Sequence, residues 1–139
     1  MRRSECPIAA ALDILGDRWT LLVLRDVLLS HQYASSEIAK AEGIATNIRN
    51  DRLERLQEAG LLERHVDPSD GRRRNYLPTE RAMALVPVLV DLIDWGEANT
   101  GADVPPEVMK VVRGVRANRE MVIEEIITGV RKSVATHKS

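Results

Sequence analysis

The 139-residue chain contains no phenylalanine, and aromatic residues make up only 3% of it. Hydrophobic residues still reach 44%, so the core must be built almost entirely from Leu, Val, Ile and Ala. No stretch approaches the roughly 18 consecutive apolar residues that a membrane-spanning helix requires. We therefore expect one domain of ordinary size, with an aliphatic core and no membrane partner.

Cysteine is nearly absent as well. The single residue, Cys6, excludes an internal disulfide framework. The N-terminal segment starts with charged residues followed by an apolar run, as a secretory signal does, but Asp13 and Asp17 interrupt that run. We therefore expect no signal peptide and a cytoplasmic location.

The motifs of common enzyme sites are also missing. The three histidines, His31, His65 and His137, are far apart, and none has the H-x3-H spacing of a zinc site. No P-loop, GxGxxG or GxSxG motif occurs. We therefore expect no catalytic residues, no metal and no cofactor; a substrate-sized pocket lined by convergent titratable groups would favour an enzyme instead.

Net charge is close to zero, at −1, but the charges are unevenly placed. Residues 1–76 hold twelve basic and twelve acidic residues, residues 77–108 hold one and six, and residues 109–139 hold seven and three. The near-neutral total argues against non-specific coating of nucleic acid. A local basic patch could still contact phosphates.

Three helices are predicted in the first third of the chain. Apolar residues at i, i+3, i+4 and i+7 indicate a helix over residues 7–15. Asp17 is placed to cap a second helix over residues 18–30, which is apolar on nearly all sides and should be central. Ser35 or Ser36 could cap a third, short helix that ends at Gly43.

A fourth helix is predicted to start with Thr46 as its cap and to stop at Gly60. At about 100° per residue, its inner face carries Ile48, Leu53, Leu56 and Ala59. Its outer face carries amides and carboxylates rather than a basic stripe: Asn47, Asn50, Asp51, Glu54, Gln57 and Glu58.

A short hairpin with a cationic tip is predicted next. Residues 61–66 have strand character, residues 68–71 have turn chemistry, and residues 75–77 begin the return strand. Arg72, Arg73 and Arg74 follow the turn directly. On an alternating strand these arginines would point to both sides, so one could enter a minor groove while the others flank it.

A helix that can enter a DNA groove beside a cationic hairpin is the arrangement of a winged helix-turn-helix. We expect Thr46, Asn47 and Asn50 to approach bases and phosphates, because Asn can bond adenine and helix N-termini attract anions. Arg49 points toward the core and could either reach a phosphate or pair with an acid such as Asp26. Arg52 also points inward and could be structural.

The remainder of the chain is predicted to be helical. Thr79 opens a long helix to about Asn99, in which Pro87 should produce a kink or a break. Residues 100–106 form a linker, followed by helices over residues 107–115 and 119–134. We therefore divide the chain into a winged helix-turn-helix domain, residues 1–100, and a C-terminal helical extension, residues 101–139, which we expect to take part in dimerisation.

Four motifs occur in order along the chain: CP-x6-GDRWTLLVLRDVLL, EGIATNIRNDRLERLQEAGLLER, DPSDGRRRNYLPTE and a helix ending in DWG. Because of these motifs, residues 6–98 resemble the HxlR family of winged-helix transcription regulators. The resemblance implies a dimeric, bacterial, nucleoid-associated, DNA-binding regulator of nearby genes. It also implies that Trp19 lies in the core or dimer interface. Arg49 replaces an aliphatic residue that is usual in the family, and Arg81-Ala82 replaces the common Lys-Gly.

Cys6 has two interpretations. Some relatives use a cysteine at this place to sense oxidants or electrophiles, and Arg2, Arg3 and the first helix could lower the pKa of its thiol. Alternatively, the thiol is buried and inert at the dimer contact. A switch would need an intermolecular disulfide or an adduct, because the chain has only one cysteine.

The sequence thus predicts a mainly α fold with a small two-stranded β wing. Its predicted partner is double-stranded DNA, bound by a homodimer on a pseudo-palindromic operator, with a small-molecule or redox effector left open. The alternatives are a ligand-responsive regulator of the MarR or PadR type and a winged-helix protein-interaction module that does not bind DNA. The wing arginines discriminate between these classes.

Overall fold

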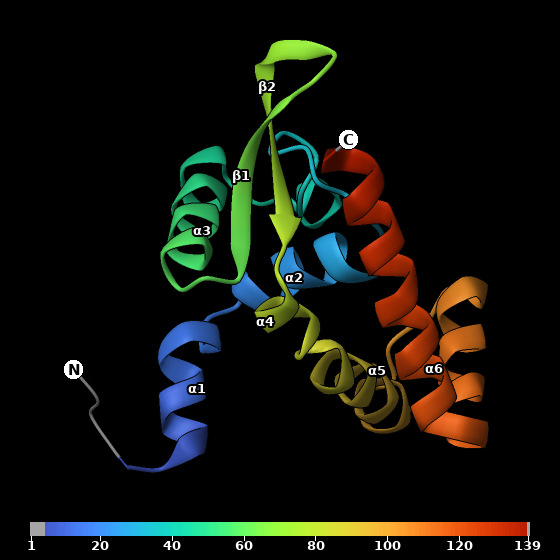
Figure 1. Cartoon of the computed structure of the whole chain (residues 1–139). Helices are drawn as coiled ribbons and strands as arrows, with labels where there is room; N and C mark the ends of the chain where they lie inside the picture. The colour runs from blue at the N-terminus through green and yellow to red at the C-terminus, as the bar shows by residue number, and fades with distance from the viewer. Residues whose placement is uncertain (1–4, 139) are drawn as a thin grey trace. The chain divides into compact units, whose positions relative to one another are not determined.

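The structure is a computed structural model that describes residues 5–138. Arg2 and Arg3, the expected neighbours of Cys6, lie outside these residues. The chain divides after Ala82 into two compact units. The first unit contains α1 (Pro7–Leu15), α2 (Thr20–Leu29), the 3₁₀ turn η1 (Lys40–Glu42), α3 (Thr46–Glu58), β1 (Leu62–Asp67) and β2 (Asp70–Pro78) (Figure 1).

The central position predicted for the second helix is confirmed. α2 contacts α1, α3 and β2, and five of its ten residues are buried. The core of this unit consists mainly of aliphatic side chains, as expected for a chain without phenylalanine. The largest fully buried ones are Val23, Leu24, Val27, Leu28, Ile38, Leu53, Leu56, Leu62 and Leu77.

The third predicted helix does not form as expected. Residues 35–39 are turns, and only the short η1 follows them. The interruption is at Ala39, whose φ of 57° lies in the left-handed region that a helix cannot contain. The Ala39 amide donates instead to Asp26 Oδ2 of α2, at 2.7 Å. A contact across 13 residues therefore outweighs the local helical pattern.

The predicted fourth helix and hairpin are confirmed, with small shifts in their ends. α3 begins at Thr46, so Ala45 rather than Thr46 is the N-cap residue. α3 ends before Gly60, whose φ of 79° favours glycine. β1 and β2 are antiparallel, and α3 lies beside β1 (Figure 1). The Thr79 hydroxyl, just after β2, donates a hydrogen bond to the Gly60 carbonyl, just before β1, at 2.7 Å, and so joins the two ends of the hairpin.

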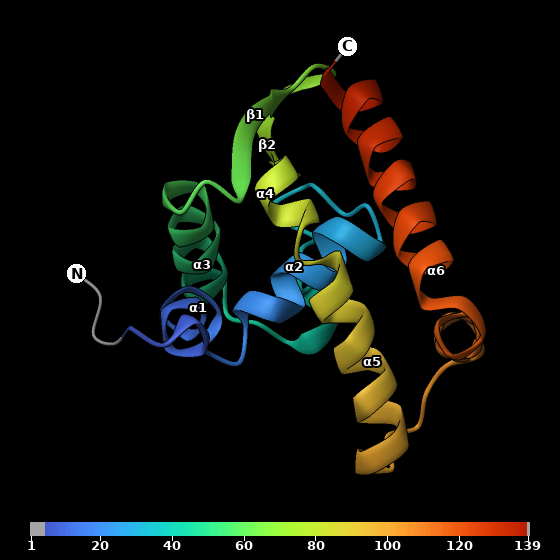
Figure 2. The same ribbon diagram turned by 60° about the horizontal axis from the view of Figure 1, so that its bottom comes forward.

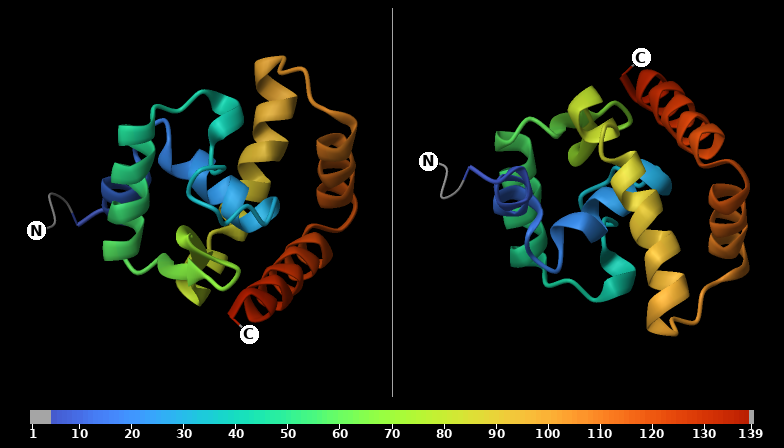
Figure 3. Two further views of the ribbon diagram at one scale, coloured as in Figure 1. Left: turned by 90° about the horizontal axis from the view of Figure 1, so that it is seen from above. Right: turned by 90° about the horizontal axis from the view of Figure 1, so that it is seen from below.

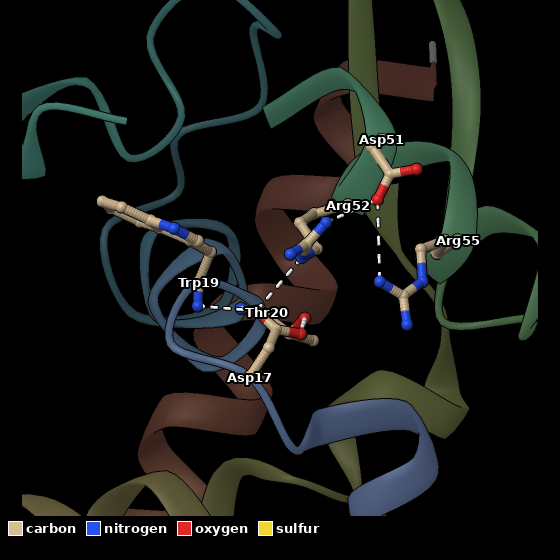
Figure 4. A network of polar contacts seen from close by, with 6 residues as sticks. All are labelled: Asp17, Trp19, Thr20, Asp51, Arg52 and Arg55. Carbon is tan, nitrogen blue, oxygen red and sulfur yellow. Dashed lines mark hydrogen bonds and ion pairs between the residues drawn. The ribbon is translucent and has the colours of Figure 1, made fainter. Parts of the chain in front are cut away.

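A polar network joins the start of α2 to the middle of α3 (Figure 4). The Asp17 carboxylate accepts hydrogen bonds from the amides of Trp19, at 2.7 Å, and Thr20, at 3.0 Å. It also accepts a hydrogen bond from the Thr20 hydroxyl, and its Oδ1 atom lies 3.1 Å from Arg52 Nε of α3. Asp17 thus has the capping role predicted for it, although α2 begins two residues later than expected.

The charged form of Asp17 is stabilised by this network. Burial alone would raise the pKa of its carboxyl group. The hydrogen bonds from the Thr20 hydroxyl and the Trp19 amide, together with Arg52, outweigh burial and lower the pKa from 3.8 to about 2.

The second unit contains two helices after the short α4 (Glu80–Met83), which crosses the boundary. α5 (Val86–Thr100) has Pro87 in its first turn, so the predicted long helix is split as expected. α6 (Pro106–Lys138) contains a non-helical residue, Asn118, with φ −158° and ψ 87°. α6 thus consists of two helical arms joined at a kink, and the bend is visible in Figures 2 and 3.

Ion pairs connect the two sides of the α6 kink to α5. Arg116 Nε lies 2.8 Å from Asp94 Oδ1, and Arg119 forms a bidentate pair with Asp91, at 2.8 Å for both contacts. Asn118 Oδ1 accepts the Met121 amide at 3.2 Å and so caps the second arm, whose start near residue 119 was predicted. These contacts stabilise the bend in α6.

The Asp17 network predicts a pH-dependent contribution to stability. Replacing Asp17 with Ala should lower the free energy of unfolding by about 1–3 kcal/mol at neutral pH, because several hydrogen bonds and the partner of Arg52 are lost. Since the folded pKa of about 2 lies below the unfolded value of 3.8, the difference should be complete above about pH 4 and shrink as pH falls toward 2. Urea unfolding at several pH values measures it. Exposed Asp103→Ala is the control, and a pH-independent difference would contradict the proposed cause.

Candidate nucleic-acid interface

The first turn of α3 presents polar groups to solvent. The side chains of Thr46, Asn47 and Asn50 are all exposed. The N-cap residue, Ala45, has no side chain that can accept a hydrogen bond from the first amides. The amides at the start of α3 are therefore not capped from the N-cap position, and such amides are suited to bind an anion.

Arg49 joins α3 to the preceding turn. Its side chain is half-buried, and its NH1 atom donates to the Ser36 carbonyl at 3.3 Å. The pairing with Asp26 considered from the sequence is not formed. The Asp26 carboxylate instead accepts the Ala39 amide and pairs with Arg25, at 2.9 Å. Arg49 is therefore held close to the start of α3 by a backbone contact rather than by an acid.

The wing does not follow the simple alternation predicted for its three arginines. Val66 is paired with Arg74 and Asp67 with Asp70, so Gly71, Arg72 and Arg73 form a bulge with no partners on β1. Arg72 and Arg73 are exposed in this bulge, whereas Arg74 is half-buried. The Arg74 guanidinium donates to the Gly71 carbonyl at 2.9 Å. Arg72 and Arg73 are thus the exposed cations of the tip, and Arg74 braces it.

Asp67 fixes the turn that carries these arginines. Its carboxylate accepts the Ser69 hydroxyl at 2.6 Å, the Ser69 amide at 2.8 Å and the Asn75 amide group at 3.2 Å. These hydrogen bonds, with the nearby Arg73, lower the pKa of Asp67 to about 2. Asp67 is therefore charged at neutral pH, and the wing turn is braced from within.

A third extended segment, absent from the sequence prediction, lies beside β2. The Ser35 amide donates to the Arg74 carbonyl at 3.0 Å, and the Tyr76 amide donates to the Tyr33 carbonyl at 2.8 Å. A single bridge, Ala34 with Asn75, joins them. So short a pairing produces no periodic pattern in the sequence. The sequence therefore predicts only a helix cap at Ser35 or Ser36 and no extended segment.

This pairing places a groove beside the wing. The groove has a volume of about 380 Å³ and is lined by Ser35, Ser36, Glu37, Asp70, Arg72, Arg73 and Arg74. Hydroxyl groups and guanidinium groups face the same space, and two carboxylates limit its net positive charge. Because Arg49 contacts Ser36, polar groups extend from the start of α3 to the wing.

The other residues singled out from the sequence have different surroundings. Arg52 faces Asp17 and Asp51, so its role is structural. The Arg18 guanidinium carbon lies 5.1 Å from the centre of the Trp19 ring, and Trp19 is half-buried. Cys6 is exposed at the N-cap position of α1, so the thiol is not buried within a single chain. Its reactivity stays a prediction.

Residues 5–138 hold neither a metal-binding cluster nor a membrane-spanning helix. No group of three or more His, Cys, Asp or Glu side chains is arranged to hold a metal ion there. No helix in this part of the chain is long and apolar enough to cross a membrane.

Comparison with known proteins identifies HTH-type transcriptional regulators as relatives. The chain is 34% identical over 90 residues to an uncharacterized HTH-type transcriptional regulator of Mycobacterium tuberculosis, covering 65% of this chain and 56% of that protein. It therefore spans little more than half the length of that relative. It is 32% identical over 97 residues to the uncharacterized HTH-type regulator YvaP of Bacillus subtilis, covering 68% of this chain and 90% of YvaP.

A solved structure has the same fold. The crystal structure of PA1607, described as a putative transcription factor, superposes with a TM-score of 0.65 at 34% identity, covering 75% of this chain and 72% of that one. The predicted fold class, mainly α with a two-stranded wing, is therefore confirmed. The model of the HxlR-like helix-turn-helix family matches residues 14–104. These matches show that the chain belongs to the HxlR-like helix-turn-helix family, a winged-helix family whose named relatives here are transcriptional regulators rather than enzymes.

Proposed function

We propose that this protein is a sequence-specific DNA-binding transcriptional regulator that acts as a homodimer on a pseudo-palindromic operator near the genes it controls. The observation that carries the proposal is the uncapped, exposed start of α3 lying in the same unit as a wing with two exposed arginines. The first feature suits base edges and a phosphate, and the second suits the backbone on either side. Family membership supports the same function.

The two parts of the interface have different roles in this proposal. Asn47 and Asn50 read bases in the major groove, while Thr46 and the first amides of α3 bind a phosphate. Arg72 and Arg73 contact the backbone or the minor groove at the tip of the wing. Arg49 and Arg74 hold the surfaces in place through Ser36 and Gly71, and Arg49 can also contact a phosphate near the start of α3.

Dimerisation is supported by apolar surface that a single chain leaves exposed. On α1, Ile8 is 71% and Leu12 is 55% exposed. On α5, Val88, Leu92 and Trp95 are also exposed, and their spacing places them along one side of the helix. Soluble proteins rarely leave such stripes uncovered. We propose that the equivalent helices of a second copy cover them and set the spacing between the two recognition helices.

Removing the wing cations tests the backbone contacts. The double variant Arg72→Ala, Arg73→Ala should bind operator and unrelated DNA more weakly, and its plot of log affinity against log salt should be shallower by roughly 1–2, because each neutralised phosphate contributes about 0.9 to the slope. Fluorescence anisotropy with the upstream promoter fragment at several salt concentrations measures both. Arg64→Ala, an exposed arginine on β1 of the same hairpin, is the matched control. Unchanged affinity and slope would exclude the wing from the interface.

Changing the start of α3 tests base recognition separately. Asn47→Ala and Asn50→Ala should each reduce discrimination between operator and scrambled DNA by about 1–3 kcal/mol, because a bidentate base contact is lost. The salt slope should stay the same, in contrast to the wing variant. Gln57→Ala, on the exposed face at the other end of α3, should change neither quantity. Equal weakening on both DNAs would mean that the asparagines do not read sequence.

Introducing charge on α5 tests the dimer. Leu92→Glu combined with Trp95→Glu should raise the dimer dissociation constant at least roughly tenfold, because burying unpaired carboxylates costs more than about 1.4 kcal/mol. Sedimentation equilibrium over a range of concentrations measures this constant. Val66→Glu replaces an equally exposed apolar residue, 54% exposed, on the wing strand and should leave the dimer intact. Dimers of unchanged stability in the α5 variant would exclude this stripe from the interface.

A further inference from the structure

The groove beside the wing has two walls that come from distant parts of the sequence. One wall is the segment that contains Ser35 and Ser36, and the other is the arginine bulge of β2. The Ser35 amide donates to the Arg74 carbonyl at 3.0 Å and so fixes one wall against the other. The DNA contacts proposed above use the arginine wall and give the two serine hydroxyls no role.

The serine wall offers two hydroxyl groups with unused donors. Ser35 is half-buried, Ser36 is exposed, and both line the groove. Among residues 5–138, no protein group accepts a hydrogen bond from either hydroxyl. The Ser36 carbonyl is held by Arg49, at 3.3 Å, which restricts the position of this wall. Each hydroxyl is therefore available to donate to an acceptor in the groove.

The arginine wall carries positive charge that the acids of the chain oppose only in part. Within the described part of the chain, no carboxylate forms an ion pair with Arg72 or Arg74. The Arg74 guanidinium donates to backbone carbonyls instead, at 2.9 Å for Gly71. Arg73 Nε lies 3.8 Å from Asp67 Oδ2, beyond hydrogen-bond distance. All three guanidinium groups thus keep donors that can bind a ligand.

The two carboxylates of the lining already have other partners. Asp70 Oδ1 accepts the Arg72 backbone amide at 3.0 Å. Glu37 Oε1 lies 3.9 Å from the ammonium group of Lys40, which is not part of the lining. Three guanidinium groups therefore face two carboxylates that are opposed elsewhere, and the groove favours an anion.

Donors on both walls select the shape of that anion. A planar carboxylate directs its two oxygens to one side, where a single guanidinium fork satisfies both. A phosphate group is tetrahedral, so its oxygens can accept from the guanidinium groups on one wall and from the hydroxyls on the other. The groove volume of about 380 Å³ leaves room for a phosphate and for part of the molecule that carries it.

We propose that the groove beside the wing is a phosphate-binding site, in which Ser35 and Ser36 donate from one wall and Arg72 and Arg73 donate from the other. The phosphate belongs either to the backbone of bound DNA or to a free phosphate ester that competes with DNA for the groove. The first source rests on the DNA-binding function proposed above. The site itself does not, because inorganic phosphate tests it without DNA.

The first experiment uses potassium phosphate and the full-length protein in the absence of DNA. If the groove accepts free phosphate, the amide NMR signals of Ser35, Ser36 and Arg72 should shift saturably, with potassium chloride at the same ionic strength as the blank. The double variant Ser35→Ala, Ser36→Ala loses both hydroxyls but no charge. It should bind phosphate roughly tenfold more weakly or worse, because a hydrogen bond to a charged group contributes about tenfold or more in affinity.

Two further variants support this comparison. Ser30→Ala removes an exposed hydroxyl of the same unit that does not line the groove, and it should leave phosphate binding unchanged. The exposed change Ser36→Ala alone is the second test variant, to be used if the amide spectrum of the double variant shows a disturbed fold.

The second experiment measures the double serine variant on DNA by fluorescence anisotropy. If the phosphate comes from DNA, affinity should fall roughly tenfold or more for the upstream promoter fragment and for scrambled DNA alike. Discrimination and salt slope should both stay the same, because the hydroxyls neither contact bases nor carry charge. This pattern differs from that of the wing arginine variant, which changes the slope, and from that of the asparagine variants, which change discrimination.

The outcomes separate the two sources from failure of the site. Weaker DNA binding by the double serine variant identifies the DNA backbone as a source, and hydroxyl-dependent phosphate shifts identify a free phosphate. A double variant that changes neither phosphate binding nor DNA affinity would overturn the site, even if phosphate still shifts the arginine signals through diffuse attraction. Hydroxyl-dependent phosphate binding by a protein that ignores promoter DNA would instead contradict the DNA-binding proposal and leave the site in place.

Discussion

The Asp17 carboxylate is the interaction on which the geometry of the first unit depends. It satisfies two amides at the start of α2, accepts the Thr20 hydroxyl and faces Arg52 of α3. A buried polar network whose members are satisfied specifies one arrangement of the elements that it joins. Here the network joins the start of α2 to α3, the helix that carries the proposed base-reading residues.

The proposed interface shows how a nearly neutral protein can present local charge. Arg72 and Arg73 are held outward by a bulge, while Arg74 is drawn back to the Gly71 carbonyl. Asp67, in the same turn, stays ionised because hydrogen bonds from Ser69 and Asn75 lower the pKa of its carboxyl group. The acids of α5 are likewise paired with arginines of α6. Arg72 and Arg73 therefore form a small, local cationic surface at the wing tip.

The sequence predicted the elements whose causes are local. Pro87 separates two helices, Gly60 ends α3 with a positive φ, and the hydrophobic pattern selects the inner face of α3. The family and its winged fold were also recognised from motifs in residues 6–98. Each of these follows from the conformational preferences of a residue or from a repeat along one helix.

The features that the sequence did not predict have long-range causes. Residues 35–39 fail to form a helix because Ala39 donates to Asp26 across the core. The arginine run does not alternate because the register of β2 shifts by three residues opposite Val66 and Asp67. Arg49 bonds the Ser36 carbonyl, a partner that no spacing rule selects. The candidate base-reading residues could be predicted from the outer face of α3. The groove beside Ser35 could not, because it depends on a single bridge that produces no pattern in the sequence.

The alanine at position 45 makes α3 less stable than a capping residue would, but it favours the proposed phosphate contact. A Ser or Asp there would typically stabilise the isolated chain by about 0.5–2 kcal/mol, so natural selection for thermal robustness alone would favour such a replacement. The same oxygen would occupy the amides that are proposed to contact a phosphate, and an aspartate would also repel that phosphate. With a methyl group at Ala45, the N-cap side chain leaves the first amides of α3 without an acceptor, which is the state that the proposed phosphate contact requires.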